Sequence, residues 1–179
     1  MIYSARYDSP LGEITIASDG TSLLGVYFEG QKYFCGSLSE EPVEKDDIPV
    51  FTAARAWLDR YFAGKKPAIE ELPLAPSGSE FRQAVWKILC EIPYGSVMTY
   101  GEIAKKIAEE KGLDTMSAQA VGGAVGHNPI SVIIPCHRVV GSNGSFTGYA
   151  GGIKRKEALL QLEGVDTKMY HMPKRGTAL

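Results

Sequence analysis

The sequence predicts an α+β protein in two parts, a small N-terminal domain of strands and one helix followed by a mainly helical domain. Apolar residues come in short strand-like stretches near the N-terminus, whereas in the second half they recur at helical spacing. The charge balance changes with the texture: residues 1–79 carry 7 Lys and Arg against 12 Asp and Glu, and residues 80–179 carry 12 against 9. We therefore expect an N-terminal domain at 1–76, a C-terminal domain at 77–166 and a basic tail at 167–179.

The N-terminal domain is predicted to be a small sheet covered by one helix. Apolar residues bounded by turn residues predict strands at 2–7, 14–17 and 23–28. The acidic, proline-containing stretch 35–49 is predicted to be a loop. From Phe51 to Phe62 apolar residues recur at helical spacing, and Gly64 ends that helix. Residues 72–79 are rich in helix breakers and are predicted to link the domains.

The C-terminal domain is predicted to contain helices at 80–91, 100–111, 117–125 and 154–162. Ser79 and Thr99 stand at N-cap positions, the third helix begins near Ser117, and Gly112 stands where the second helix ends. The two middle helices, joined by a short connection, have the outline of a helix-turn-helix. The tail beyond residue 166 carries no recognisable motif and is predicted to be disordered.

The helix at 117–125 is unusual because alanine and glycine dominate it, with Ala120, Gly122 and Gly123 in succession around Val121. One interpretation is close packing against another helix. The other is a helix slim enough to enter the minor groove of DNA, which is roughly 6 Å wide and excludes a helix with large side chains.

The pentapeptide Pro135-Cys136-His137-Arg138-Val139 carries the most reactive chemistry of the chain. A cysteine beside cationic groups can be held as the nucleophilic thiolate. Since Pro135 restricts the preceding residue to extended geometry, the apolar run 132–134 is predicted to be a strand that ends at the cysteine. The alternative is a buried, inert cysteine. Three cysteines in no short-spaced pair predict neither a zinc site nor a disulfide framework, so we expect no metal and no cofactor.

Two further features favour a nucleophile over a buried cysteine. The glycine-rich segment 141–152 contains Tyr149, which could give a flat base a stacking surface, although such a segment can also be a flexible connector. Glu163 follows the C-terminal end of the last helix, where its charge is unfavourable without a cationic partner such as His137.

These motifs resemble the O6-alkylguanine-DNA alkyltransferases, also called methylated-DNA–protein-cysteine methyltransferases. The resemblance is specific over residues 80–165 and looser over 1–79. It implies a ribonuclease H-like N-terminal domain and a winged-helix-like C-terminal domain. The matching segments are Ala120-Val121-Gly122, Asn128-Pro129, Ile134-Pro135-Cys136-His137-Arg138-Val139 and Gly148-Tyr149-Ala150-Gly151-Gly152.

The resemblance implies a role for each matching residue. Cys136 would accept the alkyl group from guanine O6, His137 would act through water as its base, and Glu163 would orient the imidazole. Asn128 would tie the turn to the active-site segment, and Tyr100 would protonate the departing base at N3. The pocket is expected to include the carbonyls of Cys136 and Val139, the ring of Tyr149 and the N–H of Ala150. The base must be flipped out of the duplex to reach the cysteine.

The expected DNA-binding residues are Gln119, Ala120, Gly122, Gly123 and Arg138. Gln119 stands where the family usually has an arginine that fills the gap left by the flipped nucleotide. Glutamine can hydrogen-bond the orphaned cytosine but lacks a charged planar group.

Three functions remain open from the sequence. The first is a single-turnover repair alkyltransferase acting as a monomer on double-stranded DNA with O6-alkylguanine, and on O4-methylthymine. The second is a lesion sensor of the alkyltransferase-like type, against which Cys136 argues. The third is a cysteine hydrolase, for which no peptide- or ester-binding signature is present. No apolar stretch approaches a membrane span of about 20 residues and no signal peptide is visible, so a cytoplasmic protein is expected.

Overall fold

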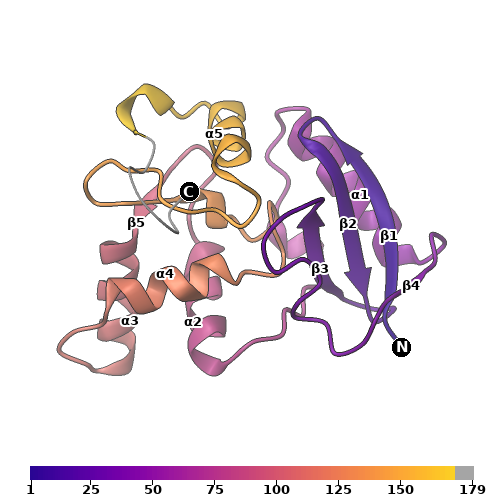
Figure 1. The fold of residues 1–179 in the computed structure, drawn as a ribbon, viewed down its shortest axis with the longest axis horizontal. Helices are drawn as coiled ribbons and strands as arrows, with labels where there is room; N and C mark the ends of the chain where they lie inside the picture. The colour runs from indigo at the N-terminus through magenta and orange to yellow at the C-terminus, as the bar shows by residue number, and fades with distance from the viewer. Residues whose placement is uncertain (172–179) are drawn as a thin grey trace. The chain divides into compact units, whose positions relative to one another are not determined.

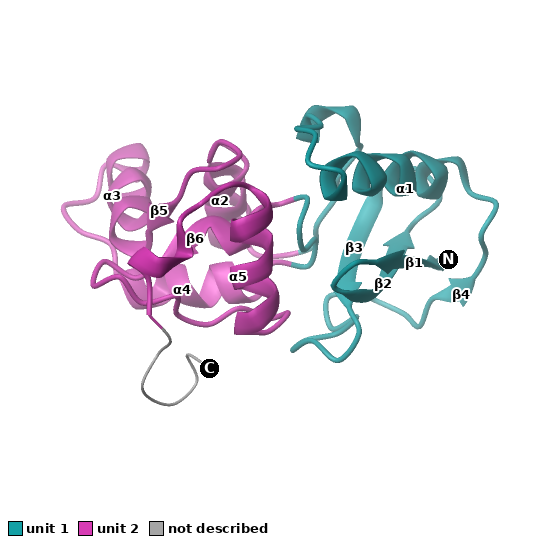
Figure 2. Cartoon of the chain, turned by 90° about the horizontal axis from the view of Figure 1, so that it is seen from above, with its two compact units in different colours: residues 1–77, 129–133 teal, residues 78–128, 134–179 magenta. Residues whose placement is uncertain are grey.

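The computed structural model describes residues 1–171 and divides into two compact units. Unit 1 comprises residues 1–77 and 129–133, and unit 2 comprises 78–128 and the chain from 134 onward (Figure 2). The segment 129–133, which the sequence analysis assigned to the C-terminal domain, therefore packs with the N-terminal unit. Among the described residues, no helix combines the length and apolar character that a bilayer crossing requires.

Unit 1 is built on a four-stranded sheet in the order β3-β2-β1-β4. Its strands are β1 (Tyr3–Ser9), β2 (Gly12–Ser18), β3 (Leu23–Phe28) and β4 (Val43–Glu44). The first three were predicted, and they pair antiparallel in sequence order. The two-residue β4 pairs parallel with β1 inside the stretch predicted to be a loop, because so short a strand depends on its partner and leaves no periodicity.

Helix α1 (Pro49–Phe62) confirms the predicted helix and lies on one face of this sheet (Figures 1 and 2). Its apolar stripe is buried: Val50, Phe51, Ala54, Trp57, Leu58 and Tyr61. A short 3₁₀ helix, η1 (Ile69–Glu71), follows.

Two later segments of unit 1 cover the free edge of β3. The N–H of Leu23 donates to the carbonyl of Pro73 at 2.8 Å, and the N–H of Val26 donates to the carbonyl of Pro129 at 2.9 Å. The N–H of Ser131 returns a bond to the carbonyl of Val26 at 3.0 Å. The chain is thus anchored in the sheet a few residues before it reaches Cys136.

The predicted strand at 132–134 is wrong, because the backbone turns twice there. The N–H of Ile133 bonds the carbonyl of Ser131 at 2.8 Å across Val132, whose φ of 71° lies in the left-handed region. The N–H of Cys136 bonds the carbonyl of Ile134 at 2.8 Å across Pro135. Both are γ-turns. The apolar side chains of this run are buried in turns rather than in a strand.

Unit 2 contains the helices α2 (Glu80–Leu89), α3 (Tyr100–Lys111), α4 (Ala118–Gly126) and α5 (Ile153–Leu162). The two predicted N-caps, Ser79 and Thr99, are confirmed, and Ser117 caps α4 in the same way. Each accepts a hydrogen bond from the backbone N–H three residues later. Gly112 ends α3 as predicted, and its backbone is in the left-handed conformation. The indole of Trp86 donates to the carbonyl of Ala124 at 2.8 Å, which joins α2 to α4.

A two-stranded parallel sheet that the sequence did not predict brings distant parts of unit 2 together. It consists of β5 (Met98–Thr99) and β6 (Val139–Val140), which lie side by side in Figure 2. β5 leads directly into Tyr100, and β6 follows the 3₁₀ helix η2 (Cys136–Arg138). The pairing therefore holds the first turn of α3 beside the cysteine-bearing segment.

The beginning of the tail is ordered, contrary to the sequence prediction. A 3₁₀ helix, η3 (Thr167–Met169), precedes His171, whose N–H donates to the carbonyl of Gly144 at 2.9 Å. The N–H of Phe146 donates to the carbonyl of His171 at 3.0 Å. These bonds fasten the glycine-rich loop. Residues 172–179 lie outside the described residues.

Candidate active site

Cys136 opens the 3₁₀ helix η2 and is 5% exposed. Asn128 supports this position, because its Nδ2 donates to the carbonyl of Ile134 at 2.9 Å. Burial raises the pKa of the Cys136 thiol, and a side-chain hydrogen bond with Asn128 and the charge of Lys156 offset this only in part. The resting residue is therefore a thiol rather than the thiolate that the sequence suggested, and it needs a base to become a nucleophile.

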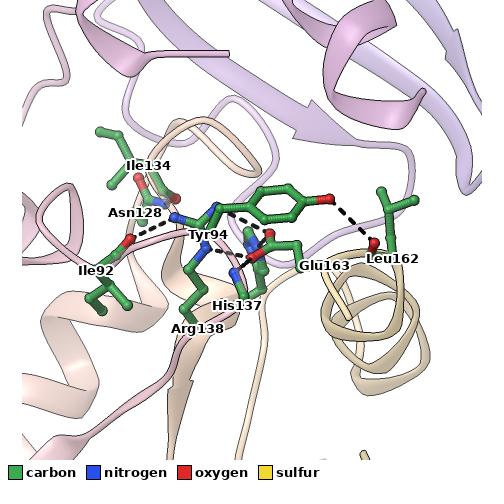
Figure 3. A network of polar contacts seen from close by, with 9 residues as sticks. Ile92, Tyr94, Asn128, Ile134, His137, Arg138, Leu162 and Glu163 are labelled. Carbon is green, nitrogen blue, oxygen red and sulfur yellow. Dashed lines mark hydrogen bonds and ion pairs between the residues drawn. The ribbon is translucent and has the colours of Figure 1, made fainter. Parts of the chain in front are cut away.

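His137 and Glu163 form a buried pair, as the position of Glu163 in the sequence predicted. The imidazole Nε2 lies 2.6 Å from Glu163 Oε2, and neither side chain is exposed to solvent. The same carboxylate accepts hydrogen bonds from Arg138 Nε at 2.8 Å, from Arg138 Nη2 at 3.2 Å and from the N–H of Gly95 at 3.0 Å. Figure 3 shows His137 and Arg138 both directed at Glu163.

This arrangement fixes the charges of the site. Burial opposes ionisation of Glu163, but its bonds to His137 and Arg138 outweigh burial and hold its pKa at about 2. Burial lowers the pKa of His137 in spite of Glu163, and the charges of Arg138 and Lys156 lower it further. Arg138 thus neutralises Glu163, and the imidazole is neutral at pH 7. Since a carboxylate only accepts, Nε2 carries the proton and Nδ1 is the basic nitrogen.

Arg138 was predicted to contact DNA, and the structure contradicts this. The side chain is buried, with 8% of its surface exposed, and its Nη1 donates to the carbonyl of Ile92 at 2.7 Å. Its guanidinium also lies 5.8 Å from the centre of the Tyr94 ring. Every part of the fork faces a partner inside unit 2, so Arg138 positions Glu163 instead of a phosphate.

Lys156 is a buried residue of the site that the sequence analysis missed. It is 0% exposed, and its Nζ donates to the carbonyls of Val139 and Phe146. Burial lowers its pKa to about 7, while the Cys136 sulfur works in the opposite direction. A signal existed, because Lys156 lies three residues from Ile153 and from Leu159 on the apolar stripe of α5.

The residues expected around the base lie on three different segments of unit 2. Tyr100 is half-buried at the start of α3, where its hydroxyl accepts a hydrogen bond from Thr147 Oγ1 at 2.8 Å. Tyr149 is buried and Ala150 half-buried in the glycine-rich loop. The carbonyl of Val139, expected to face the base, already accepts from Lys156, which leaves one of its two lone pairs for a ligand.

The alanine- and glycine-rich helix α4 exposes the residues expected to meet DNA. Gln119, Ala120 and Gly123 are exposed on it, and a Cβ added at Gly123 would meet nothing within 4 Å. Gly122 is half-buried, and its Cβ would lie 3.7 Å from the ring of Tyr100. The side chains that α4 buries are valines and alanine at other positions. The helix surface is therefore open at Gln119, Ala120 and Gly123, whereas Gly122 lies against Tyr100 of α3.

Metal ligation is not provided for in the described part of the chain, where no three His, Cys, Asp or Glu side chains are grouped to hold an ion. A buried cysteine followed by a buried histidine that a carboxylate holds, in one unit with a helix-turn-helix whose second helix is rich in alanine and glycine, is typical of a DNA-binding protein with its own sulfur nucleophile. Residues 80–165 match the family model of the 6-O-methylguanine DNA methyltransferase DNA-binding domain, and residues 2–76 match that of its ribonuclease-like domain. The chain belongs to the family of methylated-DNA–protein-cysteine methyltransferases.

Individual relatives agree with this assignment along most of their length. The methylated-DNA–protein-cysteine methyltransferase of Haemophilus influenzae is 43% identical over 164 residues, covering 92% of this chain and 87% of that protein. The Methanosarcina acetivorans protein is 44% identical and is covered to 99%. The structure of Mycobacterium tuberculosis OGT in complex with DNA aligns with a TM-score of 0.77 at 39% identity, covering 94% of each chain.

Proposed function

We propose that this chain repairs duplex DNA directly, by moving the alkyl group from O6 of guanine to the sulfur of Cys136. The observation that carries the proposal is the buried thiol beside a neutral histidine that Glu163 and Arg138 hold in one tautomer. The names of the relatives, and the DNA complex of the M. tuberculosis protein, support the same reaction.

Binding precedes chemistry, because a base inside the duplex cannot offer its alkyl carbon to a buried sulfur. The open face of α4 enters the minor groove, and the alkylated base flips into the pocket beside Cys136 at a cost of a few kcal/mol. Gln119 occupies the gap that the base leaves. The walls of the pocket are Tyr149 and the backbone of Val139 and Ala150.

The transfer is a displacement at the alkyl carbon. The thiol proton passes through water to His137 Nδ1, the sulfur attacks the carbon, and the C–O6 bond breaks with its electron pair moving onto the purine. Tyr100 gives its proton to N3, so that neutral guanine departs and a tyrosinate remains. Solvent then reprotonates Tyr100 and takes the proton from His137, so the net reaction converts thiol and alkylguanine into thioether and guanine.

The product limits each molecule to one turnover, since a thioether offers no bond that water hydrolyses readily. All residues named in these steps belong to one chain, so we expect it to act as a monomer. The nucleophile must stay reduced, which suits the reducing cytoplasm. O4-methylthymine presents the same reacting bond, and we expect it to be a second, poorer substrate.

Intact-protein mass spectrometry tests the proposal. Incubation with duplex DNA carrying O6-methylguanine should add one methyl group to the protein, and Cys136→Ser should abolish the addition. Cys35→Ser and Cys90→Ser are matched controls that should still be methylated. An unmodified wild-type protein that nevertheless binds the lesion would show a lesion sensor instead. A protein that neither binds the lesion nor becomes methylated would contradict both functions.

A further inference from the structure

Thr147 has a strained backbone in the glycine-rich loop of the site. Its φ is 55°, a left-handed value that suits glycine and that a β-branched residue rarely adopts. Strain of this kind costs about 1–3 kcal/mol and persists only where the surroundings impose it. The left-handed residue is Thr147 rather than the neighbouring Gly148, which indicates that the threonine side chain has a function at this position.

The contacts of Thr147 lead to the active site. Its Oγ1 lies 2.8 Å from the hydroxyl of Tyr100 and 2.6 Å from the carbonyl of Phe146. Its N–H donates to Ser145 Oγ at 3.2 Å. The buried Lys156 donates to the same Phe146 carbonyl at 2.6 Å. The bond from Lys156 to the Phe146 carbonyl and the bond from the Thr147 N–H to Ser145 therefore fix the backbone that places the Thr147 hydroxyl beside Tyr100.

We propose that Thr147 is a positioning residue that holds the Tyr100 hydroxyl for proton transfer to the departing base. This inference rests on the proposed function, in which Tyr100 supplies that proton. The strained backbone and the Lys156 clamp serve to keep one hydroxyl fixed beside the phenol.

The hydrogen bond from Thr147 to Tyr100 keeps its direction and becomes stronger during the reaction. The Thr147 hydroxyl has one proton and two acceptors within reach, the Tyr100 oxygen at 2.8 Å and the Phe146 carbonyl at 2.6 Å. Because Lys156 already donates to that carbonyl, we place the Thr147 proton on the Tyr100 oxygen, which leaves the phenol proton to be donated to the base. Once the proton has left, the tyrosinate is an acceptor only, so Thr147 must donate to it and the bond becomes charge-assisted. The hydrogen bond thus strengthens as charge develops on Tyr100, which lowers the barrier to proton release.

Single-turnover methyl transfer from O6-methylguanine DNA tests the inference. Thr147→Val keeps the shape but removes the hydroxyl and should slow transfer about tenfold, with lesion-DNA Kd unchanged. Thr147→Ser should stay within about twofold of the wild type. Thr147→Gly accepts the backbone angle and lacks the hydroxyl, so it should be as slow as Thr147→Val and serves if the valine variant does not fold. Ser142→Ala, on the exposed part of the same loop, is the control and should react normally.

Two further measurements separate positioning from a merely structural role. Tyr100→Phe should slow transfer about 100-fold, and adding Thr147→Val to it should slow transfer no further. Alkylation of Cys136 by methyl iodide, whose leaving group needs no proton, should proceed equally in wild type and Thr147→Val.

Each other outcome overturns a defined claim. Additive effects of the two substitutions, an equal loss with methyl iodide, or normal transfer by Thr147→Val alongside slow Tyr100→Phe would overturn the role of Thr147 alone. Normal transfer by Tyr100→Phe would show that Tyr100 is not the proton donor, and the inference about Thr147 would then be wrong as well. A wild-type protein that takes up no methyl group would overturn the proposed function itself.

Discussion

At the scale of single residues, the site depends on how charge is shared around Glu163. A carboxylate that contacted only His137 would stabilise the protonated imidazolium, which cannot accept a proton. The guanidinium of Arg138 stays protonated and forms two hydrogen bonds with Glu163, so it compensates the negative charge of the carboxylate at every relevant pH. His137 can therefore remain a neutral hydrogen-bond donor. Glu163, which bonds the imidazole of His137, is thus itself held by the buried side chain of Arg138.

The first prediction concerns this arrangement. Arg138→Met should raise the pKa of His137, because the uncompensated charge of Glu163 then stabilises the imidazolium. Below that pKa the base is protonated, so the acidic limb of the transfer rate against pH should move to higher pH, and unfolding should become easier by about 3–5 kcal/mol. Single-turnover rates between pH 5 and 9, with urea unfolding at pH 7, measure both effects.

The matched control is the exposed pair of Arg60 and Glu71, with side chains 42% and 44% accessible. Arg60→Met should leave the pH profile unchanged and cost less than about 1 kcal/mol, as surface ion pairs do. An Arg138→Met profile that overlays the wild type would mean that Arg138 does not set the protonation state of His137.

The sequence indicated the candidate reacting residues, and the pairing of His137 with Glu163, better than it indicated their surroundings. Cys136 and His137 stand together in the chain, and the unfavourable position of Glu163 indicated its partner. The contacts of Arg138, Thr147 and Lys156 could not be read, since a long or flexible side chain finds its partners only in the folded structure. Arg138 was predicted to contact DNA because its local sequence does not reveal whether the side chain is buried or exposed.

At the scale of elements, α4 contains glycines that lower its intrinsic stability as a helix. Glycine inside a helix costs roughly 0.5–1 kcal/mol relative to alanine, and α4 has it at positions 122, 123 and 126. At Gly123 the space beside the backbone is empty, so no packing within the protein requires glycine there.

The second prediction has opposite signs for stability and binding. Gly123→Leu should stabilise the free protein slightly, by a few tenths of a kcal/mol to about 1 kcal/mol, because leucine is the better helix former. The same side chain should obstruct the narrow groove and weaken duplex binding at least tenfold. Thermal unfolding and fluorescence-anisotropy titration measure the two. Ala53→Leu, on the exposed side of α1, controls for added surface leucine. If Gly123→Leu bound DNA as tightly as the wild type, α4 would not be the helix that enters the groove.

The third prediction concerns the exposed Gln119 at the start of the same helix. Gln119→Arg should tighten binding to lesion DNA and steepen its dependence on salt, because an added cation near the duplex releases a further counterion. Titrations at several salt concentrations measure the slope, and Lys154→Arg, which preserves charge, is the control. An unchanged or weaker affinity would mean that Gln119 does not occupy the gap of the flipped base.

Elements were predictable where their own residues determine them. The caps of α2 and α3 follow from local hydrogen bonding by serine and threonine, so the sequence predicted them. The pair β5–β6 and the γ-turns before Cys136 depend on partners about 40 residues away or on burial, and no local pattern records them.

At the scale of the whole molecule, the stability of the protein is linked to the site through Lys156. A buried ammonium whose nearest bonds are to carbonyls is costly, which is why burial lowers its pKa from 10.5 to about 7. Between these two pH values the unfolded chain binds the proton and the folded protein releases it. Folding stability from this residue therefore rises with pH across that range.

The fourth prediction isolates this contribution with Lys156→Met. Because the charge of the Cys136 sulfur would counteract the shift, both proteins carry Cys136→Ser. The free energy of unfolding of the lysine form, minus that of the methionine form, should rise by about 2 kcal/mol from pH 7 to pH 9. Urea unfolding at the two pH values measures it. Lys154→Met, an exposed lysine on the same helix, should give no such rise. A difference that stays flat or falls with pH would mean that Lys156 keeps its proton in the folded protein, so that the cation beside Cys136 is permanent.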